Sequence, residues 1–215
     1  MFVPAPPIPA AAPLLPVGLT SATPATLTTP VHTSLRVRYA QLNVLEGQSA
    51  SVAGALVDVH RSGLAGRMVF LQKLGSRGWR TVTRVRTGAR GRFRISYVPH
   101  ALGSQLLRLR FSGDTSDLAA RHRVGNVNVY RLAGASWYGG GGGMACGGQL
   151  TSSTLGVANK TLPCGTLVTL HYNGRTIRVP VVDRGPYVAG REFDLTEATK
   201  YALGFGDTGN VWSTR

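Results

Sequence analysis

The feature that most constrains this chain is a series of short segments between residues 34 and 131 in which apolar residues alternate with polar or basic ones. The segment FRISYVP is one example. Alternation with a period of two places the apolar side chains on one face of a β-strand and the polar side chains on the other. Turn-forming pairs such as Ser62-Gly63 separate the segments at intervals of about ten residues, a spacing typical of a β-sandwich. We therefore predict a β-sandwich over residues 34–133.

Overall composition supports an all-β protein with a packed interior. Glycine (28 of 215 residues) and proline (12) favour frequent turns over long helices. Hydrophobic residues make up 43% of the chain, which excludes disorder throughout. No apolar stretch reaches about 18 residues without interruption, so we expect no membrane-spanning helix.

The first 33 residues differ from the rest of the chain. Eight of the twelve prolines precede residue 31, and no Lys, Arg, Asp or Glu occurs before Arg36. Such a segment favours extended, polyproline-like conformations and has little to pack with. It lacks the basic start and unbroken apolar run of a signal peptide. We expect residues 1–33 to be a disordered linker or the remnant of an export region.

Charge is concentrated in the predicted sandwich. The chain carries 24 basic and 9 acidic residues, a net charge of +15. Residues 34–133 hold 17 of the basic and 4 of the acidic side chains, a net charge of +13. Residues 134–215 hold 7 and 5, a net charge of +2. The basic excess therefore belongs to the sandwich.

Arginine dominates this excess, and its planar fork matches phosphate and carboxylate groups. We predict that the sandwich binds an anionic polymer. The alternative is a basic surface that only keeps the module soluble and protects its edge strands. Nucleic acid is not expected as a partner, because the sequence has no recognition-helix pattern, zinc-finger spacing or aromatic RNA-binding motif.

Residues 134–215 form a second predicted domain. The alternating runs LVTLHY and TIRVPVVD flank an Asn173-Gly174 pair, which is a strong hairpin signal. An amphipathic helix should follow, beginning near Asp194 or Thr196 and ending at Gly204.

Two cysteines, Cys146 and Cys164, lie in this domain, 18 positions apart. A structural zinc site needs four ligands, and the two cysteines of a thioredoxin-like motif are separated by two residues, so this pair fits neither. We therefore predict no metal site and no cofactor, and interpret the pair as a structural disulfide. Two buried free thiols are the alternative. A disulfide would indicate an oxidising compartment, and so export.

The C-terminal domain also carries a family resemblance. The phrases ASWYG, ACGG, GVANKTLPCGT, VVDRGPY, GREFDLT and ALGF resemble those of the RlpA family, in the same order, over residues 134–215. The resemblance implies a six-stranded double-psi β-barrel with one or two short helices, a barrel shared with expansins and family 45 endoglucanases. It also implies an exported, extracellular or cell-wall protein acting on peptidoglycan glycan strands. The phrases GLAGRMVFLQK and GRFRISYVP resemble immunoglobulin-like modules of bacterial surface proteins. The predicted anionic partner then becomes an anionic wall polymer.

The domain has five acidic residues, of which Asp183 is the main catalytic candidate. It ends an apolar strand, where a carboxyl group can be partly removed from water. The resemblance places the family's catalytic Asp at Asp183, and the second groove Asp of expansin-like relatives at Asp194. Asp183 could instead be a turn former, and Asp194 a helix N-cap.

Four more residues complete the predicted site. Asn159 stands where RlpA enzymes carry a His that helps catalysis, and an amide can orient Asp183 but cannot titrate. Arg184, Tyr138 and Trp137 are expected to shape the groove, with core packing as the alternative for the two aromatic residues.

Three functions follow from these candidates. The first is a lytic transglycosylase, which needs one acid because the sugar's own 6-hydroxyl attacks. The second is a non-catalytic, expansin-like wall-binding module. The third is a hydrolase using Asp183 and Asp194 as a pair.

Overall fold

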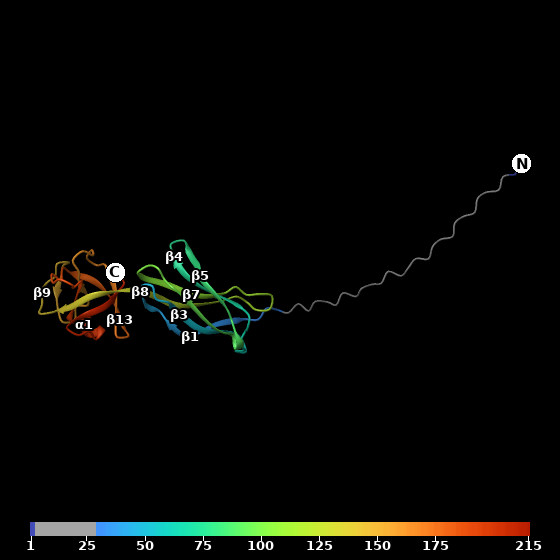
Figure 1. The fold of residues 1–215 in the computed structure, drawn as a ribbon, viewed down its shortest axis with the longest axis horizontal. Coiled ribbons are helices and arrows are strands. Elements are labelled where there is room, and N and C mark those ends of the chain that lie inside the picture. Colours follow the sequence, from blue (N-terminus) through green and yellow to red (C-terminus); the bar gives the residue numbers. More distant parts are fainter. Residues whose placement is uncertain (3–28) are drawn as a thin grey trace.

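The computed structural model describes residues 1–2 and 29–215. Its elements are almost all β-strands, and they form a sandwich (blue to green in Figure 1) followed by a barrel (yellow to red). The linker predicted for residues 1–33 lies mostly outside the described residues. Val31 already forms a bridge with Asp117 of the sandwich.

The sandwich consists of two sheets around one apolar core. The first sheet has the order β1 (Thr33–Gln41), β3 (Ala50–Asp58) and β6 (Arg92–Tyr97). The second has the order β8 (Ala120–Tyr138), β7 (Gly103–Phe111), β4 (Met68–Gly75) and β5 (Gly78–Arg86), with β2 (Asn43–Leu45) on the other side of β8. A 3₁₀ turn, η1 (Ala89–Gly91), precedes β6. The alternating apolar residues face inward: Val52, Leu71, Ile95 and Leu109 are all almost fully buried.

Strand β8 joins the two parts. Its first half pairs with β7 of the sandwich, and its second half pairs with β14 and β15 of the barrel. The predicted boundary at residues 133 and 134 therefore falls inside one continuous strand. Tyr130 on β8 is fully buried, with its ring centroid 5.6 Å from that of His171 and 5.9 Å from that of Trp212. This aromatic cluster packs the base of the barrel against the sandwich.

Six strands close the barrel. They run in the order β14 (Phe193–Thr196), β11 (Val157–Ala158), β13 (Arg175–Asp183), β12 (Leu167–Tyr172), β15 (Thr208–Ser213) and β8, and β8 pairs with β14 again. A short hairpin, β9 (Gly142–Gly143) and β10 (Gln149–Leu150), stands apart from this ring. The closed order is the predicted six-stranded barrel, and Phe193, Leu195 and Val211 fill its interior.

Local signals in the sequence are confirmed in the barrel. Tyr172 pairs with Arg175 across the turn, and Asn173 and Gly174 both take the positive φ angles that the hairpin needs. The helix α1 (Glu197–Leu203) begins after Thr196 and ends at Gly204, whose φ of 66° is left-handed. Across the described part of the chain, no helix has the length and apolar character to span a membrane.

Candidate active site

A row of residues across four barrel strands forms the candidate site. Ala158 of β11 pairs with Asp183 of β13 on one side and with Asp194 of β14 on the other. Asp194 in turn pairs with Ser136 of β8. Residues that pair across neighbouring strands lie on the same face of a sheet. The β11–β13 pairing is irregular at Ala158, but the charges of Asp183 and Asp194 both act on the Tyr138 phenol, so the fold brings the two predicted carboxyl groups close together, on either side of a small buried alanine.

The two oxygens of Asp183 have different environments. Oδ1 accepts hydrogen bonds from the backbone N–H groups of Ala145 and Arg184, both at 2.8 Å. No hydrogen bond of normal geometry reaches Oδ2 from the described residues, but the Tyr138 phenol lies close enough to Asp183 for the two groups to interact. One oxygen is thus fixed by two backbone N–H groups, whereas the other makes no such bond.

Asp194 is a strand residue and does not cap the helix. Its Oδ1 accepts a hydrogen bond of 2.6 Å from the Ser136 hydroxyl. Burial raises the pKa of Asp194, although the Ser136 hydrogen bond and the charge of Arg191 act in the opposite direction. Thr196 occupies the N-cap position, so the helix-cap interpretation of Asp194 is wrong.

Tyr138 lies beside both carboxyl groups. Burial raises the pKa of its phenol, and the charges of Asp183 and Asp194, together with a hydrogen-bonding interaction with the Asp183 carboxyl group, raise it further. Among the described residues, its Oη is the one buried side-chain polar atom with no hydrogen bond of normal geometry. Such an atom needs an explanation, because burying a polar group without a partner costs free energy. The phenol keeps its proton near neutral pH and can donate it in a hydrogen bond.

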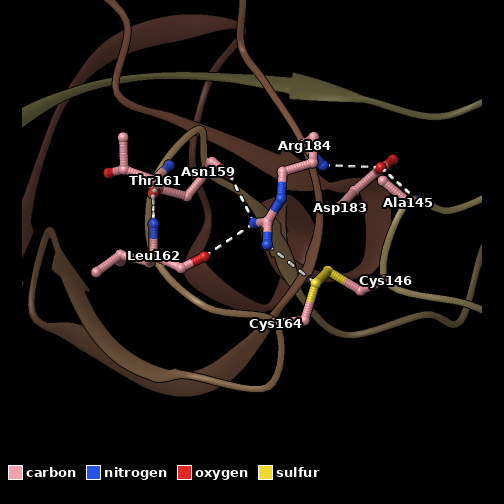
Figure 2. The surroundings of a disulfide bond; sticks show 8 residues. All are labelled: Ala145, Cys146, Asn159, Thr161, Leu162, Cys164, Asp183 and Arg184. Carbon is pink, nitrogen blue, oxygen red and sulfur yellow. Dashed lines mark hydrogen bonds between the residues drawn. A yellow bond between two sulfur atoms is a disulfide. The ribbon is translucent and has the colours of Figure 1, made fainter.

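Arg184 supports a loop beneath the site (Figure 2). Its guanidinium donates to the carbonyl oxygens of Asn159 and Leu162 at 3.1 and 2.9 Å. It also lies 3.1 Å from the Sγ atom of Cys164. These contacts occupy the guanidinium within the protein, which differs from the expectation that it lines the groove.

Asn159 also serves this loop. Its side-chain Oδ1 accepts from the backbone N–H groups of Thr161 and Leu162, and its Nδ2 donates to the carbonyl of Glu192. The expected bond to the Asp183 carboxyl group is absent from the described contacts. Instead, the backbone N–H of Asn159 donates to the backbone carbonyl of Asp183 at 3.1 Å. The reason is burial: an amide that is 3% exposed must satisfy its polar atoms locally, and the loop backbone offers the partners.

The predicted disulfide is present. Cys146 and Cys164 are bonded, with their Cα atoms 5.6 Å apart, and the interpretation as free thiols is wrong. Cys146 follows Ala145, which donates to Asp183, and Cys164 contacts Arg184. The disulfide therefore fixes both segments that surround the Asp183 carboxyl group (Figure 2).

Trp137 lies on the other face of β8 from Ser136 and Tyr138, because side chains alternate along a strand. Its indole N–H donates to Asp207 at 2.9 Å, and the Lys200 ammonium lies 3.8 Å from the ring centroid. Trp137 packs against the barrel core and this ion pair, away from the row of carboxyl groups.

Sequence reasoning missed two groups that hold the carboxyl groups, and it did not single out the exposed ring of Tyr187. Ser136 and the Ala145 N–H hold the two carboxyl groups, and no sequence signal distinguishes them from other small residues. Tyr187 is 81% exposed, four positions after Asp183. An aromatic ring directly after the DRGP phrase was the signal that could have indicated it.

Comparison with known proteins agrees with this geometry. Residues 132–212 match the lytic transglycolase family of double-psi β-barrels. The C-terminal domain thus resembles the double-psi β-barrels of RlpA-like proteins.

Two relatives illustrate the similarity. The probable endolytic peptidoglycan transglycosylase RlpA of Aquifex aeolicus is 45% identical over 75 residues, which cover 33% of each chain. Endolytic peptidoglycan transglycosylase RlpA of Pseudomonas aeruginosa (strain UCBPP-PA14) is 36% identical over 94 residues, covering 41% of this chain and 28% of its own. The chain thus spans about a third of the length of these curated relatives. Among solved structures, the Streptomyces papain inhibitor matches with a TM-score of 0.33 and 29% identity, over 39% of this chain and 90% of its own.

Proposed function

We propose that the RlpA-like barrel binds peptidoglycan glycan strands and cleaves them by lytic transglycosylation, in an exported protein that works at the bacterial cell wall. The family match and the names of its relatives support the reaction. The observation that carries the catalytic assignment is the Asp183 carboxyl group, with one oxygen held by two N–H groups and the Tyr138 phenol beside it.

One carboxyl group can serve both halves of this reaction. As the bond between C1 and the leaving oxygen breaks, the Asp183 carboxylic acid gives its proton to that oxygen. The 6-hydroxyl of the same sugar then forms a new bond to C1 and returns its proton to the Asp183 carboxylate. The product is a 1,6-anhydro sugar, and no water is consumed.

Other residues have supporting roles in this proposal. The Tyr138 hydroxyl, which lies beside Asp183 and makes no hydrogen bond of normal geometry, donates to a sugar oxygen. Asp194, held by Ser136, accepts from sugar hydroxyls on the other side of Ala158. The exposed Tyr187 ring offers a face on which a sugar can stack. Arg184 and Asn159 act as positioning residues through the loop that they hold.

One observation favours a wall-binding module, and another favours a hydrolase. Asn159 is fully engaged with backbone groups and cannot titrate, which favours a wall-binding module without turnover. The raised pKa of Asp194, caused mainly by burial, favours a hydrolase in which a second carboxyl group shares the work.

Digestion of purified, peptide-free glycan strands by the disulfide-bonded protein, with mass spectrometry of the products, distinguishes the three. We expect anhydro ends from the wild type and none from Asp183→Asn. The matched control is Asp58→Asn, because Asp58 also accepts a backbone N–H bond but lies in the sandwich. It should leave the products unchanged.

Other products would change the assignment. Reducing ends in place of anhydro ends would indicate hydrolysis. Binding of the strands without any cleavage would indicate a wall-binding module. Anhydro products that persist in Asp183→Asn would remove Asp183 from the acid role.

A further inference from the structure

Five arginines lie in two neighbouring rows on the outer face of the second sandwich sheet. Strand pairing sets two rows across this sheet, one through Arg121, Arg110, Phe70 and Arg84, and one through Arg123, Arg108 and Gln72. Members of each row lie on the same face. We call this surface the arginine face and define it by its cations: Arg84, Arg108, Arg110, Arg121 and Arg123.

The arginine face has no acidic counterpart. Within residues 29–215, the ion pairs use Arg67, Arg131 and Lys200, and none uses a member of the face. All nine acidic residues of the chain lie within that range, so no other carboxylate side chain is available to pair with them. Arg108 shows the resulting repulsion: burial lowers its pKa, and the charges of Arg121 and Arg110 lower it further. An incoming anion would relieve this repulsion.

The centre of the face is organised in advance. The Arg108 Nε donates to Gln72 Oε1 at 2.9 Å, and Gln72 Nε2 donates to the Thr81 hydroxyl at 3.1 Å. The Arg108 guanidinium lies 4.0 Å from the centroid of the Trp79 ring. These contacts use only the Nε donor and one flat side of the guanidinium. Its terminal N–H groups are left for a ligand, at little further cost in side-chain entropy.

We propose that the arginine face binds a linear phosphodiester polymer of the cell wall. Neighbouring strands lie about 4.8 Å apart and alternate residues about 6.6 Å apart, so the face is a flat grid of cations suited to successive phosphates. The Arg108 guanidinium occupies one side of the Trp79 ring, which argues against single-stranded nucleic acid, because its bases stack on free aromatic rings. The choice of a wall polymer rests on the proposed function of the barrel at peptidoglycan.

The test measures binding of the full chain to purified poly(glycerol phosphate) at 0.15 M salt. The variant R84Q/R121Q/R123Q removes three exposed arginines of the face. Its matched control, R36Q/R92Q/R94Q, removes three exposed arginines from the first sheet. We expect roughly a tenfold loss of affinity for the first variant and less than about twofold for the control, because each lost phosphate contact is a charge-assisted hydrogen bond. If either triple variant has a lowered melting temperature, single variants replace both: Arg121→Gln tests the face, and Arg92→Gln is its control.

Several results would overturn the proposal. Equal losses for the two variants would show nonspecific attraction to net charge. Tighter binding to single-stranded DNA, or to vesicles with anionic lipid, with the same dependence on the face would assign it to those ligands. Glycan digestion by R84Q/R121Q/R123Q separates this proposal from the proposed function, because soluble glycan should be cleaved normally whether or not the face binds polymer.

Discussion

Without the Cys146–Cys164 disulfide, the barrel should unfold at a lower urea concentration than the oxidised wild type does. The bond joins residues that are 18 positions apart. The chain-entropy relation assigns about 3 kcal/mol at 25 °C to a loop of that length. A domain of this size has a urea m-value of roughly 1 kcal/mol per M, so the variant C146S/C164S should lose about 3 M in its unfolding midpoint.

The same variant should also cleave glycan strands more slowly than the wild type at urea concentrations where its barrel is still folded. Cys146 anchors the segment whose Ala145 N–H donates to Asp183, and Cys164 contacts Arg184. Freeing both segments loosens one of the two hydrogen bonds to Asp183 Oδ1. We expect glycan digestion at least about tenfold slower under conditions where the barrel is folded, since losing a bond to a charged group costs about 1.5 kcal/mol or more.

Tryptophan fluorescence measures the transition. Trp137 and Trp212 report on the barrel, and a Trp79→Phe background removes the sandwich signal. Wild-type protein reduced with dithiothreitol is the matched control and should unfold at the midpoint of the double variant. A midpoint within about 0.5 M of the oxidised wild type would refute the loop-closure reasoning.

Three further predictions concern the carboxyl groups and their neighbours. Tyr138→Phe removes a buried hydroxyl that makes no hydrogen bond of normal geometry but lies beside the Asp183 carboxyl group, so the free energy of unfolding should change by less than about 1 kcal/mol while glycan cleavage slows. A larger loss of stability would mean that the hydroxyl makes a structural bond. Burial raises the pKa of Asp194 in the folded state above its ordinary value of 3.8, so the folded state holds this proton more tightly than the unfolded state does. The stability that this proton contributes is therefore lost as the pH rises from 3.8 through the raised pKa. Urea titrations between pH 3 and 7 should show Asp194→Asn gaining stability over wild type as pH rises, and a parallel pH dependence would contradict this. Tyr187→Ala should raise the KM for glycan strands about fivefold, from the loss of about 1 kcal/mol of stacking, whereas Tyr201→Ala, another exposed tyrosine at 65% exposure, should not; equal effects would remove the stacking role.

Much of the fold followed from local patterns. The alternating runs predicted the strands of both parts, and the Asn173-Gly174 pair predicted the hairpin between β12 and β13. Gly204 ended the predicted helix. These features depend on residues close in sequence, whose conformational preferences act before any tertiary contact forms.

The site was predicted only in part. Asp183 and Asp194 were expected in one groove, and the barrel brings them close together. The roles expected for Asn159, Arg184 and Trp137 did not match the contacts that these side chains make. A sequence shows which donors and acceptors a side chain carries, but not which partners burial leaves to it.

The sequence by itself therefore determined the all-β architecture, the division of charge between the two parts, and the short list of acidic residues from which a catalyst could come. Only the tertiary structure decided how the carboxyl groups are held. Ala145 lies 38 positions from Asp183, and Ser136 lies 58 positions from Asp194. Contacts over such separations exist because closing the barrel sets β8, β14, β11 and β13 side by side, and no local preference encodes that order.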